Sequence, residues 1–520
     1  MCKNTPLEPY VEGHHAHEAK VLSTERIQSH DDVSNVAVPA FITRNVEPDV
    51  VAIVSRMSQS RRSETEKRVK LKIDMFLFPL LLLFYILNYL DRGALPFVRL
   101  VGIEDELNLT GVQFDTCLSI LYVGYCLFQI PSNLILSKLK PSLYLPACMI
   151  IWGVVSGTTA AANNYTSLVT IRFILGVVEA PFFPGAIFLI SSWYTKKEMA
   201  MRCAWLYAGN FLSNAFGSLI ALGVTETLAG AHGLSSWRWL YIIEASMTVG
   251  VAILSIFILP NYPHNTRWLN PEERAVAIYR LVEDRGEMTD FEDADIGIWE
   301  GFMQAVRDYK TWIIAANHIF ITTGAGLVVF FPTVVGTLGF STRITYVLSA
   351  PPFLLAVVTT IYTCHRADIS GQRSYYMVGT LGVVLVGLII LASSLNTGAR
   401  YFSLFLITSV MWVSYNCNLA WISDCMPRPI QKKAAAIGIV SMLGQAGNII
   451  AGYIYPKNQS PRYWMAATIE AVAIVLAIVT TLAFREVLRR ENKRLDQRDQ
   501  NELGNQYTNE AGKKNFRYVL

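Results

Sequence analysis

The stretch FLFPLLLLFYILNYL, residues 76–90, decides the fold because it can cross a lipid bilayer as a single helix. It forms the centre of an apolar block at residues 73–95. A spanning helix needs about 20 predominantly apolar residues, because in hydrocarbon only the helix itself can satisfy its backbone N–H and C=O groups. The block therefore predicts a membrane helix.

Similar blocks recur along the chain on both sides of a polar stretch at 260–310. The six blocks before this stretch lie at 73–95, 113–136, 143–161, 166–190, 203–224 and 238–259. The six after it lie at 311–334, 345–364, 375–395, 400–422, 435–455 and 463–484. Only 16% of the residues are charged, against about a quarter in soluble proteins. We predict an all-α membrane protein of about twelve spanning helices in two six-helix halves.

The spacing of these blocks divides the chain into five parts. Residues 1–70 are polar and without lasting periodicity, so we predict a disordered cytoplasmic tail there. We expect a first half at 71–260, a cytoplasmic linker at 261–310, a second half at 311–485 and a cytoplasmic tail at 486–520. Transporters made of two similar halves bind their substrate near the midplane, between the halves.

Orientation follows from the position of Lys and Arg, which gather before the first block, in the linker and after the last block. Because basic loops stay on the cytoplasmic side, we predict that both termini and the linker are cytoplasmic. The Asn-x-Ser/Thr triplets then lie in outer loops as candidate glycosylation sites, at Asn108, Asn164 and Asn458.

Other function classes are disfavoured. The net charge of +4 is small and forms no groove-sized patch, so we expect no nucleic-acid partner. The eight cysteines have no metal-ligand spacing, and the tail histidines His14, His15 and His17 lack further ligands nearby. We predict no metal, no cofactor and no enzyme activity, since no nucleophile–base constellation is present.

Charges inside apolar blocks are functional candidates, because a charge at the bilayer centre costs at least about 2.5–3.5 kcal/mol. Asp91 and Arg92 end the first block, while Arg172 and Glu179 lie seven residues apart in the fourth. This spacing puts the last two on one helix face, about 10.5 Å apart. If both helices face one cavity, the four residues form a descending column. The alternative is that Asp91–Arg172 or Arg172–Glu179 is a structural ion pair that holds helices together.

The column suits the binding of a carboxylate and protons. A guanidinium offers a bidentate fork to a carboxylate, so Arg92 and Arg172 suit an anionic substrate. The acids Asp91 and Glu179 suit proton carriage. Ionisable residues nearer the block ends are weaker candidates: Glu244, His318, Asp424 and Glu470.

Uncharged polar residues inside the blocks form a second set of candidates. They either line the cavity or bridge neighbouring helices. Those we assign to substrate binding are Tyr89, Asn210, Asn416, Gln445 and Asn448.

Several motifs together resemble the anion:cation symporter family of the major facilitator superfamily, in particular its fungal allantoate permease-like branch. They are YLDR at 89–92, RFILGVVEAPFFPG at 172–185, SWY at 192–194, WRWLYIIE at 237–244 and the pieces WL, EER and PRY at 268–269, 272–274 and 461–463. The resemblance spans roughly 73–484.

The resemblance implies the major facilitator fold and a proton-coupled carrier of small organic anions such as allantoate, nicotinate or pantothenate. It implies that Asp91 and Glu179 are protonated, that Arg92 binds the substrate carboxylate and that Arg172 takes part in coupling. Asp368 and Arg373 correspond to a cytoplasmic latch. One departure is Gly93-Ala94, where the family commonly has Asn-Ile, so the substrate stays open.

We therefore expect uptake of a small organic anion with protons by a monomer in the lipid bilayer, in the plasma membrane rather than the vacuole. Export of a carboxylated metabolite by the same fold is an alternative. A nutrient sensor that no longer transports is another.

Overall fold

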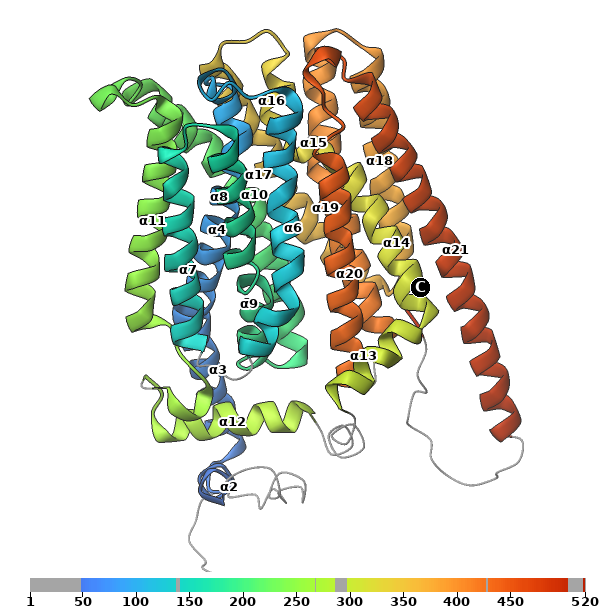
Figure 1. Cartoon of the computed structure of the whole chain (residues 1–520). Coiled ribbons are helices and arrows are strands. Elements are labelled where there is room, and N and C mark those ends of the chain that lie inside the picture. The colour runs from blue at the N-terminus through green and yellow to red at the C-terminus, as the bar shows by residue number, and fades with distance from the viewer. Residues whose placement is uncertain are drawn as a thin grey trace, which may run out of the picture.

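The computed structural model describes residues 48–136, 141–266, 268–285, 297–426, 429–503 and 518–519 of the chain. All regular structure in these ranges is helical. Figure 1 shows two groups of long helices side by side, with the short helices α12 (Pro271–Arg285) and α13 (Ile298–Arg307) across one end. We call this end the linker end and the opposite one the far end.

The first half holds the helices from α3 to α11. They are α3 (Gln59–Phe76), α4 (Phe78–Arg99), α5 (Ile103–Glu106), α6 (Gly111–Leu136), α7 (Pro141–Thr158), α8 (Tyr165–Glu179), α9 (Phe182–Ser191), α10 (Lys196–Thr227) and α11 (Ser236–Ile258). Single 3₁₀ turns lie at η1 (Thr159–Ala161), η2 (Ala231–Gly233) and η3 (Pro263–Asn265).

The second half holds the helices from α14 to α21. They are α14 (Tyr309–Gly324), α15 (Gly326–Val329), α16 (Phe331–Gly336), α17 (Thr342–Ser370), α18 (Arg373–Ser393), α19 (Thr397–Cys425), α20 (Ile430–Ala451) and α21 (Trp464–Leu503), with a 3₁₀ turn at η4 (Lys457–Gln459). This confirms the predicted all-α membrane architecture.

Ten helical stretches of the described ranges are long and apolar enough to cross a membrane, two fewer than the predicted blocks. The block at 203–224 lies in α10, which carries polar residues such as Asn210 and Asn214. The block at 311–334 is divided among α14, α15 and α16, the longest of which has 16 residues. Both departures fall on helices that line the central cavity described below.

Two helices break where they approach the middle of the bundle. α8 ends at Glu179, and α9 starts after Pro181, whose ring removes a backbone donor and disfavours helix in the preceding residue. The second break separates α14 from α15 next to Gly324 and Gly326. Backbone that leaves the helix at membrane depth is tolerated where protein or a cavity surrounds it.

The disorder predicted for 1–70 is wrong for its last part, while residues 1–47 lie outside the described residues. Residues 48–55 form α2 (Pro48–Ser55), and α3 begins at Gln59. Val50 and Val54 pack against Val276 and Tyr279 of α12, and Arg61 pairs with Glu272 of α12 at 2.8 Å. The stretch is thus ordered by the linker, a partner that its own composition does not reveal.

The halves meet mainly between the middle of the bundle and the far end. Ser119 Oγ on α6 donates to the carbonyl oxygen of Ile449 on α20 at 3.3 Å. Tyr346 Oη on α17 donates to the carbonyl oxygen of Phe97 on α4 at 3.0 Å. These contacts close the far end of the interface, and the site lies just beyond them toward the linker end.

Candidate functional site

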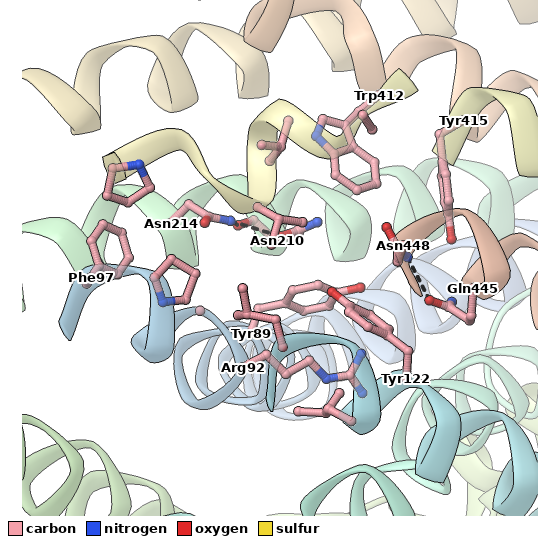
Figure 2. Close-up of a pocket in the computed structure, with 18 of the residues that line it drawn as sticks. Tyr89, Arg92, Phe97, Tyr122, Asn210, Asn214, Trp412, Tyr415, Gln445 and Asn448 are labelled. Carbon is pink, nitrogen blue, oxygen red and sulfur yellow. Dashed lines mark hydrogen bonds between the residues drawn. The ribbon is translucent and has the colours of Figure 1, made fainter. Parts of the chain in front are cut away.

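A cavity lies between the two halves and draws its wall from both. The first half contributes Tyr89, Arg92, Gly93, Pro96, Phe97, Leu118, Leu121, Tyr122, Arg172, Asn210 and Asn214. The second half contributes Ala325, Val328, Val329, Pro332, Trp412, Tyr415, Gln445 and Asn448. Figure 2 shows how these side chains converge from α4, α6, α10, α19 and α20. The wall is mostly apolar and aromatic, with a few polar groups that can orient a ligand.

Arg92 is the most exposed cation of the cavity wall. Its Nε donates to Oε2 of Glu179, the residue at which α8 breaks. The guanidinium lies 4.5 Å from the ring centre of Tyr125 and 5.3 Å from that of Tyr89. The side chain of Glu179 is fully buried, whereas that of Arg92 is 10% exposed. The cation is therefore accessible from the cavity while its counter-ion is not.

Two pairs of amides line the wall, one from each half. Asn214 Nδ2 donates to Oδ1 of Asn210 at 3.0 Å on α10. Asn448 Nδ2 donates to Oε1 of Gln445 at 2.8 Å on α20, as the dashed line in Figure 2 marks. Amides both donate and accept hydrogen bonds, so the two pairs can bond either donor or acceptor groups of a ligand.

Aromatic rings connect the halves at the level of the cavity. Trp412 of α19 packs edge-on against Phe211 of α10, with ring centres 5.9 Å apart. Tyr415 lies 6.4 Å from Tyr207 of α10 and 4.5 Å from the ring of His318. Such rings provide flat apolar faces for a planar solute.

Asp91 and Arg172 form a second polar group, in which Arg172 reaches the wall and Asp91 lies behind it. Ser156 Oγ of α7 donates to Oδ1 of Asp91 at 2.9 Å, and Thr248 Oγ1 of α11 donates to Oδ2 at 3.2 Å. Arg172 donates from Nη2 to the hydroxyl of Tyr241 at 2.5 Å and from Nη1 to the backbone oxygen of Asp91 at 3.4 Å. Both charged side chains are almost completely buried.

The predicted single column of charges is thus divided. Successive residues of an α-helix point about 100° apart, since a turn holds 3.6 residues. On α4, Asp91 therefore turns to α7 and α11, while Arg92 turns to the break after Glu179. The alternative ion pairs, Asp91–Arg172 and Arg172–Glu179, are not formed among the described residues, where Arg92–Glu179 is formed instead.

Six of the nine predicted transport residues line the cavity: Tyr89, Arg92, Arg172, Asn210, Gln445 and Asn448. Asp91, Glu179 and Asn416 are absent from the wall that the described residues build. Four further residues of the wall are not predicted from the sequence: Tyr122, Asn214, Trp412 and Tyr415. Asn214 could have been predicted from the sequence, because it lies one helical turn from Asn210. The three aromatic residues could not, because such rings are equally common in protein cores.

The residues of the predicted latch meet at the linker end of the second half. Arg373, at the start of α18, pairs with Asp368 of α17 at 2.8 Å and with Asp424 of α19 at 2.7 Å. The arginine thus joins three helices of the same half.

The three Asn-x-Ser/Thr asparagines are exposed and lie between helices. Asn108 follows α5, Asn164 precedes α8, and Asn458 lies in η4. The side chain of Asn164 also caps α8 by accepting from the backbone N–H of Ser167 at 2.8 Å. By the order of the helices, all three face the far end.

Comparisons with known proteins extend this picture. A family model described as Major Facilitator Superfamily matches residues 81–452. The chain is 30% identical over 463 residues to the MFS-type transporter cnsO of Penicillium expansum, covering 86% of this chain and 88% of that one. It is 28% identical over 489 residues to the high-affinity nicotinic acid transporter of Saccharomyces cerevisiae, covering 94% and 88%.

A third relative is the major facilitator-type transporter hxnP of Emericella nidulans, 30% identical over 442 residues, with 84% of this chain and 88% of that one covered. Among solved structures, a bacterial homolog to the human lysosomal transporter Spinster, in an inward-facing and occupied conformation, matches with a TM-score of 0.61 at 13% identity. The match covers 78% of this chain and 95% of that chain. This last likeness concerns the fold.

Proposed function

Because the chain belongs to the major facilitator superfamily, we propose that this membrane transporter couples the movement of a small organic anion to that of protons. In carriers built from two halves, the substrate site faces each side of the membrane in turn as the halves rock. The cavity between α4, α10, α19 and α20 is the site in this proposal.

The observation that carries the proposal is the pairing of Arg92 with Glu179. While Glu179 is ionised, it occupies the guanidinium that a substrate carboxylate would need. When Glu179 takes up a proton, its attraction for Arg92 falls, and the guanidinium becomes free to offer a bidentate fork to the carboxylate. Substrate binding and proton binding then favour one another, and this reciprocal coupling favours symport.

The remaining wall suggests an anion with a flat body. Aromatic rings at Tyr89, Tyr122, Trp412 and Tyr415 can hold a planar apolar portion, and the amides can bond its polar atoms. The relative named as a nicotinic acid transporter fits this chemistry, because nicotinate is a planar ring with one carboxylate. We therefore propose that the chain belongs to the anion:cation symporter branch and that nicotinate-like acids are the first candidate substrates.

We further propose that the linker end is cytoplasmic. Basic residues of α3 and the linker gather there, several in ion pairs such as Lys72–Glu273 at 2.6 Å. The glycosylation candidates at the far end then face outward. We propose the five-part division given above, with α2 and the first part of α3 inside its first segment. We also propose that the protein is a monomer in the plasma membrane. Arg373 and Asp368 are then part of a latch on the cytoplasmic side.

Uptake of labelled organic acids by cells that express the chain tests this function. We expect at least one planar monocarboxylate to accumulate faster at acidic than at neutral external pH, and we expect a protonophore to abolish the difference. Cells with the empty vector control for passive entry of the undissociated acid. Accumulation of no acid beyond that control, or accumulation insensitive to pH and protonophore, would contradict the proposal.

A further inference from the structure

A third buried acid, Glu244, lies beside the group formed by Asp91 and Arg172. It lies on α11 three residues after Tyr241 and four before Thr248, so the three side chains share one face of the helix. Tyr241 accepts from Arg172, and Thr248 donates to Asp91. The same face therefore directs Glu244 to this polar group, and the charges of Asp91 and Arg172 act on its carboxyl.

The surroundings of Glu244 contain few groups that could hold a negative charge. The residue is 1% exposed, and its Oε2 has no hydrogen-bond partner within the described part of the chain. The charged groups that act on it are Asp91 from α4 and Arg172 from α8, with Tyr241 on its own helix. From α7, Gly153 and Gly157 pack closely against α11 and bring no charge. An ionised carboxylate with one oxygen left bare in such a place is costly.

A count of charges points the same way. Within the described ranges, Asp91, Glu179 and Glu244 face two cations, Arg92 and Arg172. Glu179 is matched by Arg92. Both oxygens of Asp91 accept hydrogen bonds from hydroxyl groups, as those of an ionised carboxylate do. Glu179 and Glu244 each have one oxygen without a hydrogen-bond partner among the described residues, but only Glu179 has a paired cation. The excess acid is therefore Glu244.

The second half repeats this feature at the matching place. Ile243-Glu244-Ala245 on α11 has a counterpart in Ile469-Glu470-Ala471 on α21, the last long helix of its half. Glu470 is fully buried, accepts from the hydroxyl of Tyr455 at 2.8 Å and leaves its Oε2 without a partner in the described ranges. Its surroundings differ in one respect: in the part of the chain that the structure describes, hydrogen bonds but no charges act on it. Glu470 is therefore the matched control for Glu244.

We propose that Glu244 is a proton-binding site of the transport cycle, holding a proton in the conformation seen here and exchanging it with Asp91 as the halves move. In the exchange, the O–H bond of the Glu244 carboxyl breaks and an O–H bond to an Asp91 oxygen forms, so the net charge of the group stays constant. The exchange rests on the proposed proton-coupled function. The proton held by Glu244 does not depend on which solute is carried.

Infrared difference spectroscopy of the full-length protein in lipid vesicles tests the inference without any substrate. A protonated carboxyl absorbs through its C=O stretch outside the amide bands, so exchange between acidic and alkaline buffer reports titrating buried acids. We expect Glu244→Gln to remove one component of this band and Glu470→Gln to leave that component unchanged. If Glu244→Gln shows the same carboxyl difference band as the wild-type protein, with no component missing, the proposal is overturned.

A second variant keeps the test decisive if Glu244→Gln fails to fold. Glu244→Asp retains an acid in a slightly different position, so the component should shift in frequency and persist. An unchanged component in this variant would likewise count against Glu244. The readout also separates the two proposals: failure of every organic acid in the uptake screen would reject the proposed function, whereas only the infrared result decides the proton on Glu244.

Discussion

Arg92 on α4 and Glu179 at the end of α8 form an ion pair in which the cation faces the cavity and the acid lies behind it. The break in α8 after Glu179 places the acid at this point, because Pro181 prevents the helix from continuing. In the proposed mechanism, a substrate carboxylate and the Glu179 carboxylate compete for this guanidinium, and protonation of Glu179 decides the competition.

Glu179→Gln should abolish accumulation against a gradient while the protein still folds. The amide keeps an oxygen that can accept from Arg92 but cannot take up or release a proton at physiological pH. The measurement is accumulation and counterflow of a transported acid in vesicles. Counterflow should persist, and Glu226→Gln, a change at a half-exposed far-end residue, should behave as wild type. Accumulation that keeps its pH dependence in Glu179→Gln would remove this residue from the mechanism.

Arg92→Lys should weaken substrate binding despite its unchanged charge. An ammonium is a point charge that lacks the planar fork of a guanidinium. We expect KM to rise about tenfold, equivalent to about 1.4 kcal/mol, with a smaller effect on the maximal rate. Initial uptake rates over a range of concentrations measure it. Arg343→Lys, at an exposed far-end position, is the control, and equal KM values for the two variants would argue against a bidentate contact.

Gly176→Ala should destabilise the first half. A methyl group at Gly176 on α8 would overlap the carbonyl oxygen of Leu121 on α6, so the two helices would have to separate. Overpacking of this kind costs about 1–3 kcal/mol. Gly250→Ala on α11, where the methyl group meets open space, is the matched control. Thermal unfolding in detergent should show a lower midpoint for the first variant only, and equal midpoints would refute the close packing.

Glu106→Gln should lower stability at neutral pH and have little effect in acid. Burial opposes ionisation of this far-end carboxyl, but hydrogen bonds from Ser235, Trp237 and Arg238 outweigh it and lower its pKa. A lowered folded-state pKa stabilises the protein above the unfolded-state value of about 4.3, and this contribution is lost as pH falls. Unfolding midpoints of variant and wild type, measured from neutral to acidic pH, should converge. A constant difference would show that the charge of Glu106 is unimportant.

The sequence predicted the architecture well, because most of the spanning helices carry their own apolar signal. It also predicted six residues of the cavity wall, since a polar residue such as Asn210 or Gln445 is conspicuous in an apolar block. The direction in which Asp91 and Arg92 point could not be predicted, because it depends on how α4 is rotated against α7, α8 and α11.

Other parts needed partners from distant segments. α2 is ordered by apolar contacts to α12, more than 200 residues later in the chain. Trp412 and Tyr415 acquire a role only through their position opposite α10. Glu244 is a weak candidate in the sequence, and its place in the polar group follows only from the bonds that Tyr241 and Thr248 make to Arg172 and Asp91.

Proton movement driven by the substrate tests the central claim most directly. Purified protein is reconstituted in vesicles that enclose a pH-sensitive dye. An organic acid that cells expressing the protein accumulate is then added outside, with no pH gradient imposed. We predict that the lumen acidifies with wild-type protein faster than in protein-free vesicles, and that Glu179→Gln lowers the rate to that of the protein-free control. Transport of the acid with no proton entry beyond that control would contradict coupling through the Arg92–Glu179 pair.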